Sequence, residues 1–232
     1  MTSQPALHLD DVTKTYRVGD ADIVALSHID LTVASDEIVA LIGPSGSGKT
    51  TLCSIAGGIL APTSGEVTVA GTRITGYSDR QLTEFRQRNI GFVFQSVNLI
   101  PFLTARENLL IVDELGRRTG QAARDRADTL LEELGLADRR NNLPEQLSGG
   151  QRQRVAIGRS LMNEPTLVLF DEPTSALDSK LGEQVMELIQ SEMKSRGTAA
   201  IIVTHDDRIT HYADRTVQIV DGRLATEPAR RT

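Results

Sequence analysis

A glycine-rich stretch near the start of the chain carries the residue types that hold phosphate groups. It reads Gly43-Pro44-Ser45-Gly46-Ser47-Gly48-Lys49-Thr50 and is called the phosphate loop below. Glycines let backbone N–H groups turn inward around an anion, and a following helix N-terminus adds its dipole. We expect Lys49 to contact the β- and γ-phosphates of a nucleotide and the Thr50 hydroxyl to ligate Mg²⁺. An empty glycine-rich turn is the alternative, but the preceding apolar run and the following helical pattern favour nucleotide binding.

Two acidic residues close a second apolar run. Leu167-Val168-Leu169-Phe170 is followed by Asp171 and Glu172. Charges at the end of a buried strand are costly unless they bind something. Beside a phosphate loop, we expect Asp171 to hold Mg²⁺ through its water shell. Glu172 would orient or deprotonate the water that attacks the γ-phosphate. The alternative is a strand that reaches the surface and caps the next helix.

A third segment, Leu147-Ser148-Gly149-Gly150-Gln151, precedes another amphipathic helix and is called the signature segment below. Ser148 is a good N-cap, and the glycines leave backbone N–H groups open, so this helix terminus suits an anion. A plain cap and turn is the alternative. Because the chain has one set of metal and base residues, we expect the signature segment to serve the nucleotide of another subunit.

The apolar patterns around these motifs predict a mostly parallel sheet with helices on both faces. Strand-length apolar runs occur at 38–42, 90–94, 167–170, 199–203 and 217–220, and helical patterns at 49–60, 124–134, 151–162 and 180–196. Earlier in the chain, Ile29, Leu31 and Val33 alternate with polar residues, which predicts short strands of a half-buried antiparallel sheet. The stretch at about 97–146 shows no strong strand, so we expect it to form a mainly helical inserted lobe.

Composition limits the possible partners. The 232 residues include 25 Lys and Arg against 31 Asp and Glu, which gives a net charge of −6. Such a chain lacks the broad basic surface of a duplex-binding domain, and its 3% aromatic content argues against base stacking, so we expect no nucleic-acid partner. The single cysteine excludes an internal disulfide, and neither a signal peptide nor a membrane-spanning run is visible.

Together, the phosphate loop, the Asp171-Glu172 pair and the signature segment resemble the ATP-binding subunits of ABC transporters, over about residues 7–224. The resemblance implies that Tyr16 stacks on adenine and that Gln95 senses Mg²⁺ and the attacking water. It also implies that Asp178 lies where two subunits touch, and that His205 contacts the γ-phosphate. The implied catalytic residues are Lys49, Gln95, Glu172 and His205, and the implied metal ligands are Thr50, Gln95 and Asp171. The implied ATP-binding residues are Tyr16, Gly43, Pro44, Ser45, Gly46, Ser47, Gly48, Lys49, Thr50, Thr51, Ser148, Gly149, Gly150, Gln151 and Asp178.

The implied fold class is α/β: a P-loop NTPase with a RecA-like, mostly parallel sheet, an N-terminal antiparallel β subdomain and an inserted helical lobe. We expect the ATPase domain to span 7–226, with the RecA-like core at about 7–95 and 151–226 and the helical lobe at about 96–150. We expect residues 227–232 to form a flexible tail.

The resemblance also implies partners. The subunit would bind ATP and Mg²⁺, pair with a second copy and drive a separate integral membrane permease, as a peripheral protein on the cytoplasmic face of the inner membrane. Stretches 57–67 and 98–108 are similar to the MacB/LolD-type branch, which favours export or the transmission of motion across the membrane. An importer subunit and a soluble, non-transport ABC ATPase stay as alternatives. A P-loop GTPase is disfavoured because no Asn-Lys-x-Asp motif is present.

One apolar segment is the candidate contact with that permease. Leu99, Ile100, Phe102 and Leu103 lie close together, beside charged residues, just after Gln95. A subunit without a membrane span needs an apolar groove for a short helix of its partner. The alternative is that these side chains pack inside the lobe.

Overall fold

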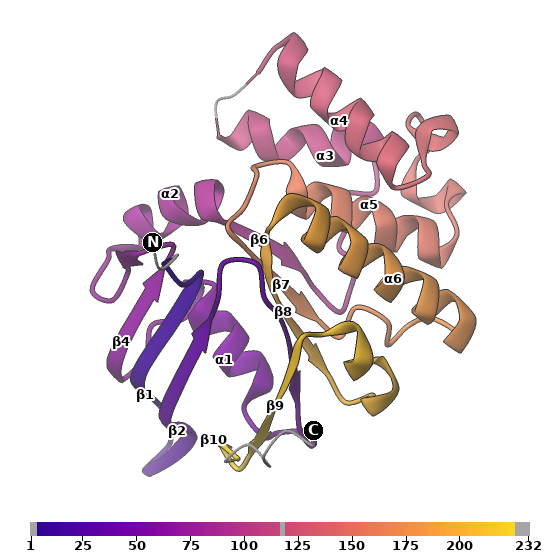
Figure 1. Cartoon of the computed structure of the whole chain (residues 1–232). Helices are drawn as coiled ribbons and strands as arrows, with labels where there is room; N and C mark the ends of the chain where they lie inside the picture. Colours follow the sequence, from indigo (N-terminus) through magenta and orange to yellow (C-terminus); the bar gives the residue numbers. More distant parts are fainter. Residues whose placement is uncertain (1–3, 117–118, 226–232) are drawn as a thin grey trace.

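The computed structural model describes residues 4–116 and 119–225 (Figure 1). The strands are β1 (Leu7–Val18), β2 (Ala21–Val33), β3 (Ile38–Ile42), β4 (Ser64–Val69), β5 (Thr72–Arg73), β6 (Ile90–Val93), β7 (Leu167–Asp171), β8 (Ala199–Thr204), β9 (Arg215–Val220) and β10 (Arg223–Leu224). The α-helices are α1 (Lys49–Ala56), α2 (Asp79–Asn89), α3 (Ala105–Leu115), α4 (Gln121–Glu133), α5 (Gly149–Leu161) and α6 (Ser179–Arg196). Short 3₁₀ helices lie at Ala137–Arg139, Pro144–Gln146 and Asp207–Tyr212.

The main sheet has the strand order β10-β9-β3-β8-β7-β6, and every pair except β9 with β10 is parallel. Side chains alternate between two cores, one on each face of this sheet. In β8, Ile201 and Val203 enter the core shared with α1, whereas Ala200 and Ile202 enter the core shared with the helices α3 to α6. Burial on both faces explains the continuous apolar runs in the sequence, and the expected α/β fold class is confirmed.

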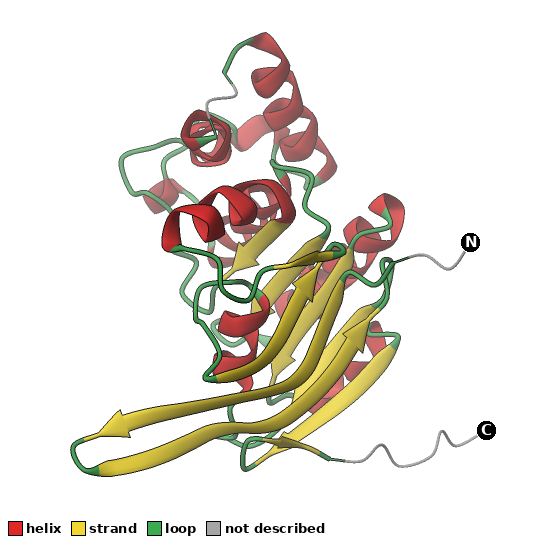
Figure 2. Cartoon of the chain, turned by 90° about the vertical axis from the view of Figure 1, so that its left-hand side faces the viewer, coloured by secondary structure: helices red, strands yellow, loops and turns green. Residues whose placement is uncertain are grey.

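The N-terminal sheet, with the order β2-β1-β4-β5, is antiparallel and packs with α1 against one face of the main sheet (Figure 1). Its first two strands are longer than the short strands expected from the sequence. Register shifts interrupt their pairing between Leu9 and Thr15, and Asp11 and His28 adopt left-handed conformations there. These bulges break the alternation that would have revealed the full strands. Beyond them, the β1–β2 hairpin projects from the molecule as a two-stranded ribbon (Figure 2).

Two helices differ from the predicted pattern. The sequence predicted one helix over 49–60, but α1 ends at Ala56, because Gly58 turns left-handed (φ 62°). A Cβ at Gly57 would lie 2.0 Å from the Phe92 ring, so the chain passes too close there for another residue. The sequence analysis missed α2 entirely, because this helix buries no residue fully. Its one local signal was the capping box of Ser78 and Gln81.

The expected helical lobe is formed by α3, α4 and two of the 3₁₀ helices, which pack on α5 above the main sheet. Arginine side chains connect this lobe to α5 by donating hydrogen bonds to main-chain carbonyls. Arg126, on α4, donates to the carbonyls of Leu161 and Met162 at the end of α5, and Arg154, on α5, donates to that of Leu134. The lobe boundaries at 96–150 stay a prediction, and the expected end of the domain at 226 and the tail at 227–232 lie outside the described residues.

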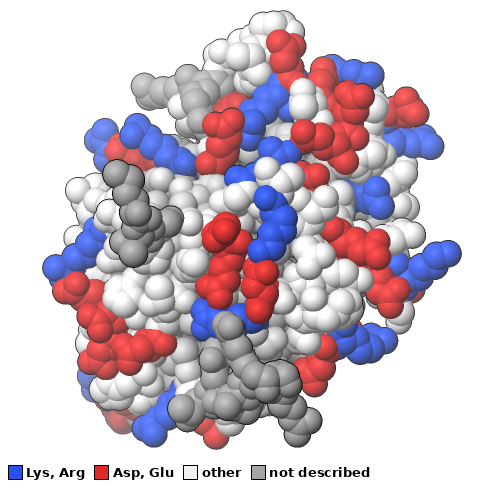
Figure 3. Space-filling view, viewed as in Figure 1, with Lys and Arg blue, Asp and Glu red and all other residues white. Residues whose placement is uncertain are grey.

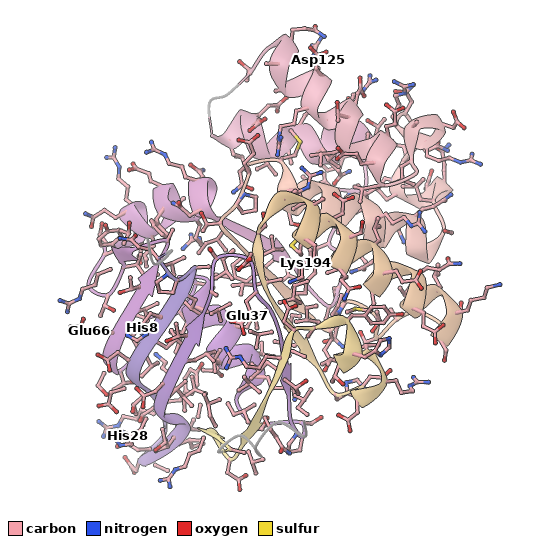
Figure 4. The ribbon with its side chains drawn as sticks, viewed as in Figure 1. His8, His28, Glu37, Glu66, Asp125 and Lys194 are labelled. Atoms are coloured by element: carbon pink, nitrogen blue, oxygen red, sulfur yellow. The ribbon has the colours of Figure 1, made fainter. Side chains whose placement is uncertain are left out.

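Charged side chains join the elements at the edge of the main sheet where β3 begins. Asp214 Oδ2 accepts hydrogen bonds from Ile38 N (2.8 Å) and from Lys194 Nζ (2.6 Å), and Arg215 pairs with Glu37. Although burial opposes it, these two hydrogen bonds and the Lys194 charge hold the pKa of Asp214 below its usual range. Glu37 and Lys194 are marked in Figure 4, and acidic and basic side chains are interspersed over this face in Figure 3.

None of the helices in residues 4–116 and 119–225 combines the length and apolar character needed to span a bilayer.

The single cysteine is buried in the helix that follows the phosphate loop, and this burial changes the pKa of its thiol. Cys53 lies in α1 and is only 3% exposed. Burial, and to a smaller extent the Asp171 carboxylate, raises the pKa of its thiol far above its usual range. The thiol therefore stays protonated in the folded protein at pH values where it ionises in the unfolded chain.

We predict a stability loss at alkaline pH that depends on Cys53. Because the folded-state pKa is raised, the stabilisation is complete below the unfolded-state pKa and declines as the pH rises above it. Between about pH 7.5 and about pH 9.5, the wild type would lose about 1.4 kcal/mol more free energy of unfolding than Cys53→Ala, taking about 8.5 as the unfolded-state pKa. Urea denaturation of both proteins measures the difference. Equal losses would show that the thiol ionises in the folded protein.

Candidate functional site

The phosphate loop connects β3 to α1 at the edge of the main sheet where the parallel strands end. Gly46 (φ 79°) and Gly48 (φ 105°) adopt left-handed conformations, and Gly48 is the N-cap of α1 without a side-chain cap. A Cβ at Gly48 would also lie 2.6 Å from the carbonyl oxygen of Ala25. The loop therefore requires glycine at this position and leaves the first N–H groups of α1 open to an anion.

Lys49 shapes the loop from within. Its Nζ donates to the carbonyl oxygens of Gly43 (2.6 Å) and Pro44 (2.9 Å), and the side chain is only 8% exposed. The ammonium group thus lies under the loop, where a bound anion would share it with these two carbonyls.

A cavity of about 370 Å³ brings together ten of the residues expected at the site. Its volume suits a ligand of nucleotide size. The lining residues are Ser45, Gly46, Gly48, Lys49, Thr50, Thr51, Gln95, Asp171, Glu172, Val203 and His205. Of these, only Val203 was not expected from the sequence, where it was assigned to a buried strand. The catalytic, metal-binding and nucleotide-binding roles of the others stay predictions.

Asp171 and Glu172 enter the cavity from the end of β7, and their environments differ. Burial and the neighbouring Glu172 carboxylate raise the pKa of Asp171, against the opposing effects of the Lys49 charge and a hydrogen bond from the Thr50 hydroxyl. Asp171 thus lies beside Thr50, the hydroxyl expected to share a Mg²⁺ ion with it. A cation bound at this point would relieve the repulsion between the two carboxylates.

Glu172 is held in a strained conformation. Its backbone is left-handed (φ 51°), its N–H donates to the Val203 carbonyl, and its Oε1 lies 2.8 Å from Nδ1 of His205. A non-glycine residue in this region costs free energy, and such residues cluster at functional sites. The structure thus joins the residues expected to be the base and the γ-phosphate contact.

The oxygen ligands fit the way Mg²⁺ binds in phosphate sites. The described residues contain no group of three or more His, Cys, Asp or Glu side chains that could hold a metal. Mg²⁺ instead uses one or two protein ligands, together with waters and substrate phosphates. A hydroxyl from Thr50, an amide oxygen from Gln95 and a carboxylate from Asp171 line the same cavity and supply such a partial set.

The signature segment is not among the residues that line this cavity. Ser148 caps α5 by accepting from the Gln151 N–H, while the Gln151 side chain accepts from the Ser148 N–H. Ser148 is exposed, and a Cβ at Gly150 would lie 2.7 Å from Leu181. The expected cap is therefore present, and the open helix terminus faces outward. Whether another subunit's nucleotide binds there stays a prediction.

The remaining expected residues do not line the cavity. Tyr16 is 38% exposed near the tip of the β1–β2 hairpin, and Asp178 caps α6 by accepting from the Leu181 N–H. Sequence reasoning gave no role to Lys14, whose Nζ lies 5.3 Å from the centre of the Tyr16 ring and donates to the Ala61 carbonyl. Gly43, Pro44 and Ser47 belong to the loop but lie outside the lining.

A separate groove of about 340 Å³ lies between the main sheet and the helical lobe. Its walls include Ile59, Phe92, Phe94 and Val112, and the two phenylalanine rings stack with centroids 5.2 Å apart. Phe102, in the segment singled out from the sequence, is 78% exposed, so it does not pack inside the lobe. Its neighbours Leu99, Ile100 and Leu103 are partly buried.

Comparison with known proteins places the chain in a family. The family model described as ABC transporter matches residues 26–175. The protein MJ0796 of Methanocaldococcus jannaschii, described as an uncharacterized ABC transporter ATP-binding protein, is 43% identical over 225 residues, which cover 95% of this chain and 96% of that protein. Its dimeric structure in a post-hydrolysis state bound to ADP and Pi matches with a TM-score of 0.87 at 40% identity, over 97% of this chain and 100% of that one.

Two further relatives carry transport names. The putative hemin import ATP-binding protein HrtA of Staphylococcus haemolyticus is 42% identical over 219 residues, which cover 94% of this chain and 99% of that protein. The macrolide export ATP-binding/permease protein MacB of Brucella melitensis is 42% identical over 231 residues, which cover all of this chain but 36% of the larger protein.

The first test of the site is removal of the Lys49 ammonium. We predict that Lys49→Ala lowers MgATP affinity about 10- to 100-fold, the loss expected from one or two charge-assisted hydrogen bonds. Equilibrium binding of ATP measures it. Lys194→Ala is the matched control, because it removes a lysine on α6, beside the start of β3, that does not line the cavity. Equal affinities of Lys49→Ala and the wild type would show that the loop is not the phosphate site.

Proposed function

The chain belongs to the ABC transporter family as an ATP-binding, ATP-hydrolysing subunit, and we propose that it works as a homodimer that drives a separate membrane permease. The observation that carries the proposal is the cavity in which Lys49, Gln95, Asp171, Glu172 and His205 converge. It combines a phosphate loop with acids and a histidine positioned for reaction at the γ-phosphate.

In the proposed reaction, each residue has a distinct task. The open N–H groups of α1 and the Lys49 ammonium bind the β- and γ-phosphates. Glu172 takes a proton from the attacking water, and His205, at hydrogen-bond distance from Glu172, contacts the γ-phosphate. Thr50, Gln95 and Asp171 would hold Mg²⁺, which neutralises charge on the phosphates as the bond to the leaving group breaks. Tyr16 stacks on the adenine ring.

The proposed homodimer completes the site. The signature segment does not line its own chain's cavity, and its helix N-terminus is capped by Ser148, which is exposed. In a head-to-tail pair it would close over the γ-phosphate bound by the other copy, and Asp178 would lie near the contact between the copies. The dimeric structure of the relative MJ0796 supports the pairing of two copies.

The proposed permease partner would place the subunit at the cytoplasmic face of the inner membrane. The groove, lined by Phe92 and Phe94, and the exposed Phe102 offer the apolar surface that a short helix of the permease needs. The relative MacB, which is named as a macrolide export ATP-binding/permease protein, supports such a partner and favours export. An importer is the second candidate, and the name of the relative HrtA favours it.

Dimerisation is tested by trapping the closed pair. We predict that Glu172→Gln lowers the hydrolysis rate about 100-fold or more, because it keeps the side-chain shape but removes the base. With MgATP, this variant would then accumulate as a dimer, which light scattering measures. Adding Lys49→Ala to it removes the phosphate contact and would return it to a monomer. A Glu172→Gln variant that binds MgATP and stays monomeric would count against the composite site.

The permease contact is tested by a charge placed on the exposed ring. We predict that Phe102→Asp abolishes co-purification with the permease encoded by an adjacent reading frame while MgATP binding is retained, because the phosphate loop lies in the other lobe. Leu115→Asp, at another exposed apolar position in the lobe (67% exposed), is the matched control and would keep the partner. Retained co-purification of Phe102→Asp would refute the assignment. A melting curve of each variant checks the fold.

A further inference from the structure

The segment that carries Gln95 has no regular structure of its own. Residues 94–104, called the connecting segment below, join the end of β6 to the start of α3 without forming a helix or a strand. Its backbone polar groups are therefore held largely by side chains from elsewhere. The Asn108 side chain binds the end of the segment next to α3. It accepts a hydrogen bond from the Ile100 N–H and donates to the carbonyls of Ile100, Leu103 and Thr104.

Arg159 serves the end nearest to Gln95. One guanidinium nitrogen donates to the carbonyl oxygen of Asn98 (2.8 Å) and another to that of Val97 (3.1 Å). Asn98 has a left-handed backbone (φ 47°), so the chain turns sharply at the point where Arg159 binds it. Two parallel hydrogen bonds from a planar, rigid donor fix both position and direction. The turn begins only two residues after Gln95.

The charge of Arg159 has no evident structural counter-ion. No ion pair among the described residues includes it, and burial alone lowers its pKa. A partly buried cation without a carboxylate is costly. Arg126, on α4, differs because it pairs with Glu164. The two carbonyls of the connecting segment are therefore the main polar partners that offset the burial of Arg159.

Arg159 belongs to the helix that begins with the signature segment. It follows Ser148 by eleven residues, which is about 16 Å along the axis of a straight helix. Between these two points α5 buries Gly150, Gln153 and the run from Val155 to Gly158. A buried helix of this kind moves as a rigid body. The connecting segment and the signature segment are thus attached to opposite ends of one rigid element.

We propose that Arg159 is the positioning residue that sets the place of Gln95 and links it to the signature segment through α5. The inference rests on the proposed role of Gln95 in sensing Mg²⁺ and the attacking water. A shift of the connecting segment when the γ-phosphate is bound or lost is passed by the guanidinium to α5. In the opposite direction, closure of the signature segment on a partner's nucleotide draws Gln95 into the cavity.

A kinetic double-mutant cycle on the full-length subunit tests the proposal. We expect Arg159→Met to lower kcat for ATP about 10-fold while the KM and the binding constant for MgATP change less than about two-fold. Gln95→Ala would lower kcat by a similar factor. Because Arg159 acts through Gln95, its removal would add little once Gln95 is replaced. The kcat of the double variant would then lie within about two-fold of that of Gln95→Ala. Arg159→Lys keeps the charge and can donate a hydrogen bond but loses the planar pair of donor nitrogens, so it would recover part of kcat.

Arg126→Met is the matched structural control. It also removes an arginine that donates to two main-chain carbonyls, those of Leu161 and Met162 at the end of α5, and we expect a lowered melting temperature with unchanged kcat. If Arg159→Met does not fold, Arg159→Lys is measured instead, in the wild type and in Gln95→Ala. The proposal then requires that Arg159→Lys lowers kcat in the wild type but not in Gln95→Ala.

Four results would overturn the proposal. If the two decreases in kcat multiply in the double variant, Arg159 acts independently of Gln95. The same conclusion follows if Arg159→Met lowers kcat and Gln95→Ala does not. Unchanged kcat in Arg159→Met, with only a lowered melting temperature, would make the residue structural. A wild-type subunit with no more ATPase activity than Lys49→Ala would instead refute the proposed function, and this inference with it.

Discussion

In-register pairing of the parallel strands is the constraint on which the nucleotide site depends. Ile42 pairs with Thr204 across β3 and β8, and Asp171 pairs with Val203 across β7 and β8. The phosphate loop, Glu172 and His205 follow these residues directly, so three distant parts of the chain emerge at one edge of the sheet. The register is set by apolar side chains that enter both cores, because a one-residue slip would exchange the two sets. The geometry of the site is therefore held by the packing beneath it.

Charge in the cavity gives the site a second requirement. The lining offers one ammonium, from Lys49, against the carboxylates of Asp171 and Glu172. A triphosphate entering alone would meet more negative than positive charge, and its attraction would rest on the N–H groups at the start of α1. A cation that arrives with the substrate removes this conflict, which is why a site with few metal ligands of its own suits a nucleotide–metal complex.

Sequence reasoning reached furthest where chemistry and burial are both local. The phosphate loop, the acids after β7 and the two-faced strands were predictable, because glycine spacing and continuous apolar runs are visible within a few residues. Prediction from sequence failed where tertiary contacts determine whether a helix forms and where it ends. The end of α1 depends on the approach of the Phe92 ring to Gly57, and α2 has little apolar periodicity because it buries no residue fully. The role of Arg159 depends on two carbonyls about sixty residues earlier in the chain, which no local pattern indicates.

The connecting segment also determines which parts of the molecule can open separately. On one side of it, β6 is paired along its whole length with β7, and on the other, α3 begins with a capping box. Between them the backbone relies on a few side-chain bonds, so its amides would exchange with solvent at a lower free-energy cost than those of the central strands. Local opening of the connecting segment would break a few side-chain bonds and leave the pairing of β6 with β7 in place. The core that α3 and α4 share with β7 and β8 would likewise stay packed.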